Sequence, residues 1–200
     1  MKIIFGVNSV ISESAIIGSG TKVWHNVQIG ENTKIGKNCI IGSSVYIGNN
    51  VLIGDNVKIQ NAALLFEGVN IESGVFIGPG VIITNDKNPR SVSNDGLLKG
   101  KSDWQLESVK IGYGASLGAG TICVAPITIG DWAMTGAGSV ITVDVKKYSL
   151  VLGNPARHVG WIGESGKKLV ILEEYLYQCP ITKQKFELAN GHLKKVENKS

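Results

Sequence analysis

Large apolar residues recur at every sixth position from Phe5 to Ile83 without a gap, and a small or β-branched residue stands four places after almost every one of them. The apolar members are Phe5, Ile11, Ile17, Val23, Ile29, Ile35, Ile41, Ile47, Ile53, Ile59, Leu65, Ile71, Ile77 and Ile83. Because six is not a multiple of the 3.6-residue helical turn, these residues would spread around a helix axis. The pattern therefore excludes an amphipathic α-helix.

Two inward positions in each six-residue unit fit a short strand followed by a turn. Glycine often follows the large apolar residue, as at Gly36 and Gly78, and we expect it to supply the backbone freedom of the turn. Stacked units of this kind pair their backbones with the coils above and below them, which predicts a parallel β-helix.

The repeat stops at Thr84, resumes at Ile111 and continues to Ile141. The step from Ile83 to Ile111 is not a multiple of six, so residues 84–110 are predicted to leave the wall as an extruded loop. This segment is rich in Asn, Asp, Lys, Ser and Gly. Long loops without their own periodicity are uncommon in compact domains and are usually functional.

The chain divides into a β-helix domain over residues 1–160 and a small C-terminal β-hairpin appendage over residues 161–200. In the appendage, residues 175–180 and 184–196 are typical of short strands, with a hairpin turn at Asn190-Gly191. Residues 166–177 also fit a helix. The appendage is too small for a large core of its own, so we expect it to lean on the β-helix or on a neighbouring chain.

Composition and charge narrow the class of protein. Of the 200 residues, 43% are hydrophobic and 18% are charged, which is typical of a globular domain. No run approaches the roughly 18 continuous apolar residues of a membrane helix, and the first residues do not resemble a secretory signal. The net charge of +4 suits small anions but comes without the basic runs of a nucleic-acid binder. We therefore expect a cytoplasmic protein that binds neither nucleic acid nor membrane.

The hexad of an aliphatic residue, a glycine, two variable residues and a small residue resembles the repeat of the hexapeptide-repeat acyltransferases. The exit segment of that superfamily is similar to LGNPARHVGW at 152–161. A narrower resemblance, to the nucleotide-linked 3-amino-sugar N-acetyltransferases, rests on KIQN at 58–61, EGV at 67–69, VFIGPG at 75–80 and above all TNDKNPRS at 84–91. Within that group the sequence looks most like the UDP-2-acetamido-3-amino-2,3-dideoxy-glucuronate N-acetyltransferases of surface-polysaccharide and O-antigen biosynthesis.

The resemblance implies an all-β, left-handed parallel β-helix that works as a homotrimer and transfers an acetyl group from acetyl-CoA to a sugar 3-amino group. Enzymes for dTDP-linked 3-amino-3,6-dideoxyhexoses share much of the motif and are the alternative. A γ-type carbonic anhydrase has the same fold but needs three zinc-binding histidines around each site, a set that His25 and His158 do not resemble. An O-acetyltransferase stays an alternative, although this chain lacks the loop histidine that a hydroxyl nucleophile would need. A structural or ice-binding β-helix would favour flat threonine rows without a large loop.

The resemblance also implies 18 residues in each coil, which puts Glu67 and Asn85 one turn apart. They are then predicted to stack on one face beside Asp86. Neighbouring strands lie about 4.8 Å apart, so these side chains can reach one small group. The resemblance implies that they surround the sugar amine. An amine must be neutral to attack a thioester and must lose a proton, so we expect Asn85 to direct the amine and Glu67 or Asp86 to accept a proton or hold the ammonium form. A surface charge at Glu67 and a loop cap at Asn85 are the structural alternatives.

Arg90 is a candidate for binding the diphosphate or a sugar carboxylate, and a second set of residues is expected to hold coenzyme A along a groove between subunits. Small-residue turns leave backbone groups accessible to the pantetheine amides, and Arg157 can pair with a phosphate. The cofactor candidates are Gly118, Ala119, Gly136, Ala137, Lys147, Arg157 and His158, with Lys146 in support.

The cysteines and His25 are expected to be structural. Cys39 and Cys123 fall on inward positions, where a buried thiol stays protonated and unreactive. Cys179 alone cannot make a four-ligand zinc site, so we predict a metal-free hairpin and no metal site. His25 lies about three coils before Asn85, too far to act there within one chain.

Overall fold

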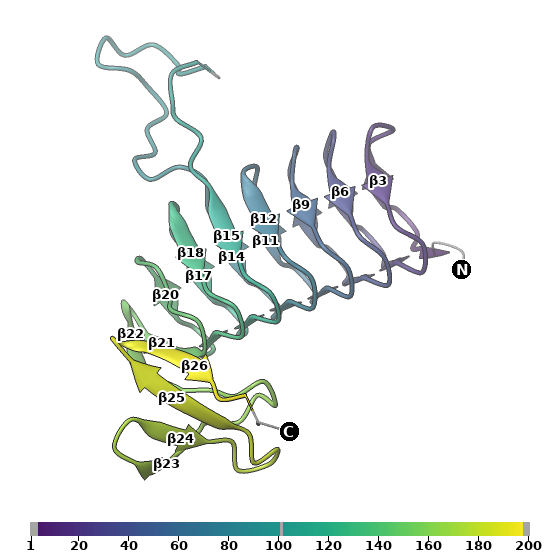
Figure 1. Ribbon diagram of the computed structural model, residues 1–200. Helices are drawn as coiled ribbons and strands as arrows, with labels where there is room; N and C mark the ends of the chain where they lie inside the picture. Colours follow the sequence, from purple (N-terminus) through teal and green to yellow (C-terminus); the bar gives the residue numbers. More distant parts are fainter. Residues whose placement is uncertain (1–3, 101, 198–200) are drawn as a thin grey trace.

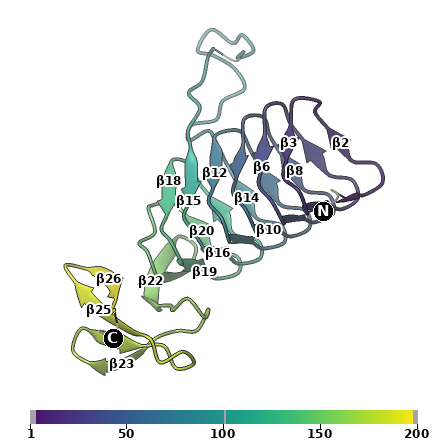
Figure 2. The ribbon, with the colours of Figure 1, turned by 45° about the vertical axis from the view of Figure 1, so that its right-hand side comes forward.

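The computed structural model describes residues 4–100 and 102–197, and its regular elements are all strands. Short parallel strands stack into three flat sheets that enclose a triangular, prism-like body (Figures 1 and 2). Sheet A contains β1 (Ile4–Phe5), β4 (Lys22–Val23), β7 (Ile40–Ile41), β10 (Lys58–Ile59), β13 (Phe76–Ile77), β16 (Ser116–Leu117), β19 (Met134–Thr135), β21 (Ser149–Gly153) and the antiparallel β22 (Ala156–Trp161).

The other two walls follow the same rule. Sheet B contains β2 (Val10–Ile11), β5 (Gln28–Ile29), β8 (Tyr46–Ile47), β11 (Leu64–Leu65), β14 (Ile82–Ile83), β17 (Ile122–Cys123) and β20 (Val140–Ile141). Sheet C contains β3 (Ile16–Ile17), β6 (Lys34–Ile35), β9 (Leu52–Ile53), β12 (Val69–Ile71), β15 (Val109–Ile111) and β18 (Ile127–Ile129). Each coil runs from sheet A to B to C, so three corners follow, named here A/B, B/C and C/A. The predicted all-β parallel β-helix is confirmed.

Strand register fixes the length of each coil. Lys22 pairs with Ile40, Ile40 with Lys58, and Lys58 with Phe76, which confirms the 18-residue coil. Across the loop the register steps from Ile82 to Ile122, a separation of 40 residues, so 22 residues are added to that one coil. The second residue of the two-residue strands points inward and the first points outward.

The inward residues form one continuous apolar core. Val75, Ile77, Val81 and Ile83 are at most 1% exposed. Cys39 and Cys123 are fully buried within the same core, as predicted. Burial raises the pKa of the Cys39 thiol and raises the pKa of Cys123 to about 12, so both stay protonated at neutral pH.

The glycine after the large apolar residue is needed for a different reason from the one the sequence suggested. Gly36 and Gly78 do not have a positive φ; the left-handed position falls two residues later, at Asn38 and Gly80. A Cβ at Gly78 would lie 2.7 Å from both the Ala119 nitrogen and the Leu117 oxygen of the next coil. The prediction that this glycine frees the turn is wrong, because the stacked backbones approach too closely for any side chain.

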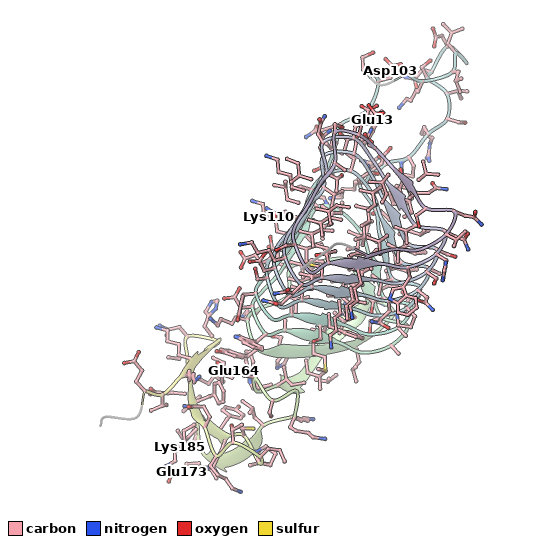
Figure 3. The ribbon with its side chains drawn as sticks, turned by 90° about the vertical axis from the view of Figure 1, so that its right-hand side faces the viewer. Glu13, Asp103, Lys110, Glu164, Glu173 and Lys185 are labelled. Atoms are coloured by element: carbon pink, nitrogen blue, oxygen red, sulfur yellow. The ribbon has the colours of Figure 1, made fainter. Side chains whose placement is uncertain are left out.

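The loop leaves the wall at the B/C corner after β14 and returns before β15 (Figure 1). Its base is tied where the Glu107 amide donates to the Asn85 carbonyl at 2.9 Å. In Figure 3, Glu13 marks the B/C corner in the first coil and Asp103 marks the loop beyond that corner.

Four antiparallel strands form the appendage: β23 (Val170–Glu173), β24 (Leu176–Gln178), β25 (Lys185–Ala189) and β26 (His192–Lys195). The Asn190-Gly191 hairpin is confirmed, with both residues at positive φ. The helix over 166–177 is wrong, since β23 and β24 pair as a hairpin through Tyr175, which has a left-handed φ of 64°.

A second small core joins the appendage to the last coil, as expected of an element too small to stand alone. The centroids of the Tyr148 and Phe186 rings lie 5.1 Å apart, and Trp161 and Leu169 are buried beside them. The Cys179 sulfur lies 3.0 Å from the Ser165 hydroxyl. No helix in the described ranges is long and apolar enough to cross a membrane.

Candidate functional site

A cavity of about 510 Å³ opens where the loop joins the B/C corner. Three of the predicted substrate residues, Asn85, Asp86 and Arg90, line it together. The other lining residues are Ser91, Leu98, Lys99, Gly100 and Trp104, all from the loop. The structure therefore brings the amide, carboxylate and guanidinium to one hollow.

Glu67 occupies the same corner but does not line this cavity. Leu65 pairs with Ile83, which puts Glu67 and Asn85 in successive coils at the B/C corner, as the 18-residue register predicts. The Glu67 carboxylate, however, accepts a 2.6 Å hydrogen bond from the Asn50 amide in the preceding coil. Glu67 thus sits at the edge of the site and is held on the side away from the loop.

Asp86 and Arg90 are held by local bonds along the outgoing limb of the loop. The Asp86 carboxylate accepts a hydrogen bond from the backbone N–H of Asn88 at 2.8 Å, which forms an Asx-type turn. The Arg90 guanidinium donates to the Pro89 carbonyl at 2.9 Å. The Asn85 side chain has no protein hydrogen-bond partner in the described part of the chain, while its backbone carbonyl closes the loop base. Its amide is therefore available to a ligand.

The predicted cofactor turns lie on the A/B corner, along the opposite edge of sheet B. The turn at Gly118-Ala119 stacks on the turn at Gly136-Ala137, and the Gly138 amide donates to the Ala119 carbonyl at 2.8 Å. At the same corner in an earlier coil, the Ser43 amide is capped by the Asn61 side chain. Alanine supplies no such cap, and within residues 4–100 and 102–197 the Ala119 N–H has no protein acceptor. This corner presents an exposed amide donor without a covering side chain.

Arg157 continues this edge beyond the last coil. Thr135 pairs with Val151, and Leu152 pairs with Arg157 in the closing hairpin, so Arg157 follows the Gly136 turn. His158 stands next along the strand, its ring 4.5 Å from that of Trp161. Burial lowers the pKa of His158, and the nearby Lys146 and Lys168 lower it further, so this imidazole is neutral at pH 7.

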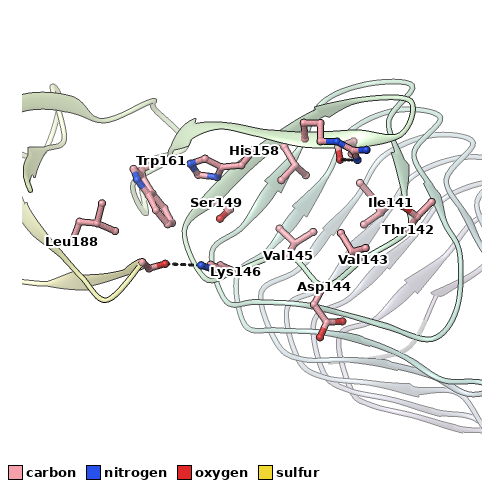
Figure 4. Close-up of a pocket in the computed structure, with 14 residues that line it drawn as sticks. Ile141, Thr142, Val143, Asp144, Val145, Lys146, Ser149, His158, Trp161 and Leu188 are labelled. Carbon is pink, nitrogen blue, oxygen red and sulfur yellow. Dashed lines mark hydrogen bonds between the residues drawn. The ribbon is translucent and has the colours of Figure 1, made fainter.

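These residues border a cavity of about 770 Å³ between the last coil and the appendage (Figure 4). Lys146 closes one side, where its ammonium donates to the Gly191 carbonyl at 2.9 Å. The lining residues are Ile141, Thr142, Val143, Asp144, Val145, Lys146, Ser149, Val151, Ala156, Arg157, His158, Trp161, Leu188 and Gly191.

Two other predicted positions lie away from these groups. Lys147 belongs to the C/A corner, where it forms a 3.1 Å ion pair with Asp131. His25 belongs to the A/B corner of the second coil, and its Nδ1 accepts from the Val7 amide at 2.9 Å, in keeping with a structural role. Across the described ranges, no group of three or more His, Cys, Asp or Glu side chains is arranged to hold a metal ion.

Comparison with known proteins confirms the repeat. A family model described as "Hexapeptide repeat of succinyl-transferase" matches residues 108–143, and one described as "GMPPB C-terminal domain" matches residues 23–92. Residues 108–143 are therefore similar to a known hexapeptide repeat. The resemblance to hexapeptide-repeat acyltransferases stated from the sequence is thereby confirmed.

Proteins similar to this chain include a sugar N-acetyltransferase. The dTDP-3-amino-3,6-dideoxy-alpha-D-galactopyranose 3-N-acetyltransferase of Aneurinibacillus thermoaerophilus is 40% identical over 79 residues, which are 39% of this chain and 40% of that protein. PerB from Caulobacter crescentus, solved in complex with CoA and GDP-perosamine, shares the fold with a TM-score of 0.51 and 21% identity, over 80% of this chain and 58% of PerB. WeeI from Acinetobacter baumannii gives a TM-score of 0.50 at 25% identity, over 78% and 57% of the two chains. The chain thus spans less than two thirds of each of these relatives.

The sequence did not predict Leu98, Lys99 and Trp104, which the structure places around the loop cavity. They lie outside the repeat, so periodicity gives them no signal. Trp104 is nevertheless the only aromatic residue in the segment 84–110, which marks it as unusual in a polar loop.

Proposed function

We propose that this protein is an acetyl-CoA-dependent N-acetyltransferase acting on the amino group of a nucleotide-linked amino sugar. The observation that carries the proposal is the joining of Asn85, Asp86 and Arg90 in one cavity at the root of the loop. The 40%-identical stretch shared with a dTDP-3-amino-sugar N-acetyltransferase supports the reaction class. The fold shared with PerB, which binds CoA and a GDP-linked amino sugar, supports the donor and the acceptor.

The proposed reaction joins the sugar nitrogen to the thioester carbon of acetyl-CoA. The nitrogen lone pair forms the new C–N bond, the tetrahedral intermediate collapses, and CoA leaves as the thiolate. One proton leaves the nitrogen and one reaches the CoA sulfur. The side-chain carbonyl oxygen of Asn85 (Oδ1) accepts a hydrogen bond from the amine and sets its direction. Asp86 holds the ammonium form or accepts its proton. Glu67 supports the corner from its bond to Asn50.

Coenzyme A is assigned to the A/B corner. The uncapped Ala119 N–H suits a pantetheine carbonyl. Gly118 packs against the next coil and Gly136 against Leu152, whereas a Cβ at Gly138 would meet nothing within 4 Å, so Gly138 lets an extended chain approach the backbone. Arg157 follows on the same edge, where its guanidinium fork suits a phosphate. His158 lies beside Arg157, whereas Lys147 stays paired with Asp131.

We further propose a homotrimer, because sheet B separates the two halves of the site. The sugar residues lie on its B/C edge and the cofactor turns on its A/B edge, so one copy cannot bring them together across the wall. The outward residues of sheet B are all uncharged: Val10, Gln28, Tyr46, Leu64, Ile82, Ile122 and Val140. Sheets A and C carry outward lysines instead, such as Lys58 and Lys110. An uncharged apolar face suits burial against a second copy.

The face assignment can be tested on its own. Ile82→Lys puts a charge on sheet B, and we expect light scattering to show smaller species at micromolar concentration. Asn70→Lys puts the same charge on sheet C of the same region, and this variant should keep the wild-type mass. A wild-type monomer, or equal effects of both variants, would contradict the face assignment.

For the acceptor we propose the UDP-2-acetamido-3-amino-2,3-dideoxy-glucuronate type, used in the cytoplasm for surface-polysaccharide or O-antigen biosynthesis. It rests on the motif TNDKNPRS and on Arg90, which suits a sugar carboxylate. The dTDP-3-amino-3,6-dideoxyhexoses are the second candidate, because the 40%-identical stretch belongs to an enzyme for such a sugar.

A thiol-release assay with acetyl-CoA tests the proposal. The acceptors are UDP-, dTDP- and GDP-linked amino sugars, and the matched 3-hydroxy sugars serve as controls. We expect CoA release with an amino sugar and none with its hydroxy counterpart. The UDP-linked uronate should give the highest kcat/KM. Release with no amino sugar would refute the function, and a higher kcat/KM for a dTDP sugar would select the second candidate.

A further inference from the structure

Backbone hydrogen bonds between the two limbs of the loop fix both ends of the loop cavity. At its lower end the Glu107 amide donates to the Asn85 carbonyl, and at its upper end the Lys99 amide donates to the Ser91 carbonyl at 3.0 Å. Val92 and Leu98 form an antiparallel bridge just beyond the upper tie. The two limbs of the loop therefore enclose an opening of fixed ends rather than hanging as a free tail.

The lining changes in character from one end of the opening to the other. Asn85 and Asp86 stand at the wall, Arg90 and Lys99 stand on facing limbs, and Trp104 lies on the returning limb. Trp104 is 36% exposed, so most of its surface is covered while part of it stays accessible. A volume of about 510 Å³ lies within the range of small-molecule sites, roughly 300–1,000 Å³.

The carboxylates near the cavity are engaged by backbone amides. Asp86 accepts from the Asn88 amide, and Asp103 accepts from the Gly100 amide at 2.6 Å. The cations Arg90 and Lys99 form no ion pair among the residues that the structure describes. The part of the opening beyond Asp86 therefore offers two cations and one aromatic surface to a ligand.

We propose that this part of the loop cavity binds the nucleoside diphosphate portion of the acceptor, with the base on Trp104 and the phosphates between Arg90 and Lys99. An aromatic ring stacks on any nucleobase, and two cations on opposite limbs match the charge of a diphosphate. The inference rests on the proposed function, since it places the sugar amine at Asn85 and the nucleotide further along the loop. Trp104 and Lys99 are then binding residues that determine specificity for a nucleotide-linked sugar.

Binding can be measured without catalysis. UDP, dTDP and GDP are each titrated into the protein, with and without CoA, while tryptophan fluorescence is recorded. We expect quenching that saturates for at least one of them. It should disappear in Trp104→Phe and persist in Trp24→Phe, which removes an exposed tryptophan of the A/B corner. Quenching that survives Trp104→Phe, or no quenching by any of the three, overturns the proposal.

Kinetics separate this subsite from the proposed function. Trp104→Ala should lower kcat/KM for the nucleotide-linked amino sugar about 5- to 150-fold through loss of base stacking. It should leave kcat/KM for the same amino sugar 1-phosphate within about twofold, because that acceptor has no base to stack. Lys99→Ala should weaken the binding of UDP far more than the binding of uridine, because uridine has no phosphates. Leu97→Ala, on the exposed tip outside the cavity, is the matched control and should change neither substrate.

The outcomes distinguish two failures. Acetyl transfer that proceeds normally in Trp104→Ala refutes the subsite and leaves the function intact. Nucleotide quenching through Trp104 without any acetyl transfer supports the subsite and refutes the function. Equal losses for the nucleotide sugar and the sugar 1-phosphate would show that Trp104 only shapes the loop, which also overturns the proposal.

Discussion

The wall and the loop of this chain obey different rules. In the wall, each inward residue packs against counterparts in the coils above and below, so its identity follows from the repeat. In the loop, the chain is held by a few backbone bonds at its base and middle, and many of its side chains face solvent. We therefore expect the wall to provide stability and the loop to provide recognition. Substitutions should separate along the same line.

The largest effect is expected from a cavity in the wall. Ile77→Ala removes a fully buried side chain from sheet A and should lower the free energy of unfolding by about 2–5 kcal/mol. Leu97→Ala removes a side chain that is 66% exposed and should change it by less than about 0.5 kcal/mol. Urea unfolding of both variants checks the contrast. Similar losses would mean that the loop is part of the folded core.

The end of the wall should carry the charge that binds the cofactor. Arg157→Gln is expected to raise the KM for acetyl-CoA about 10- to 150-fold at pH 7.5, through loss of a charge-assisted hydrogen bond. His158→Gln should have little effect there, because the lowered pKa of His158 leaves it neutral. As the pH falls through the lowered pKa of His158, the imidazole gains a proton, so the wild-type KM should fall relative to His158→Gln. An unchanged KM in Arg157→Gln would show that the phosphates of acetyl-CoA bind elsewhere.

At the loop base, Asn85→Ala should lower kcat/KM about 5- to 150-fold, as expected for a lost hydrogen bond to the reacting amine. The Glu107–Asn85 backbone bond survives this change, so the thermal midpoint should stay within about 1 °C of wild type. Asp86→Asn should lose activity at neutral pH and recover part of it at higher pH, where more amine is free. Glu67→Gln should be milder, since Glu67 faces Asn50. Parent-rate acetylation by Asn85→Ala would show that the site is misplaced.

The wall thiols should matter least to the reaction. In a Cys179→Ser background, Cys39 and Cys123 should resist a thiol reagent at pH 8 until the protein is unfolded, because both are buried and have raised pKa values. Cys39→Ala and Cys123→Val should keep the parental kcat/KM. Rapid labelling of the native protein, or lost activity with the oligomer preserved, would contradict this assignment.

The repeat made much of the wall predictable, because each coil poses the same packing problem. It predicts the burial of Cys39 and the point where the loop departs, whereas the 18-residue coil came from the resemblance to the hexapeptide-repeat acyltransferases. It could not reveal why Gly78 is needed, since the clash involves a neighbouring coil's backbone rather than the local turn. The register places Glu67 between two coils, so its carboxylate could bond to Asn50 in the preceding coil or to the loop in the next one. The sequence alone does not predict that it bonds to Asn50. Residues 166–177 fit both a helix and a hairpin, because short apolar runs carry no decisive period.

The loop resisted prediction because its shape depends on a few specific contacts. Nothing in the sequence predicts the hydrogen bond between the Lys99 amide and the Ser91 carbonyl. That bond sets the upper end of the cavity that Trp104 also lines. The sequence predicts that Asn85, Asp86 and Arg90 lie near one another because they belong to one short motif next to the wall, and they line one cavity. Residues on the returning limb have no such neighbour in sequence.

The two edges of sheet B are proposed to meet as one site only between copies. Two variants test this proposal: Asn85→Ala, which removes the side-chain amide proposed to direct the sugar amine, and Ala119→Trp, which fills the exposed A/B turn of the cofactor edge. Each alone should show strongly reduced transfer. When both are co-expressed equally and purified as mixed oligomers, about a quarter of the sites should combine an intact loop from one copy with an intact turn from another. Recovery to about a quarter of the wild-type rate is the predicted result. Activity that stays at the level of the separate variants would show that both edges must come from one copy, and would contradict the account.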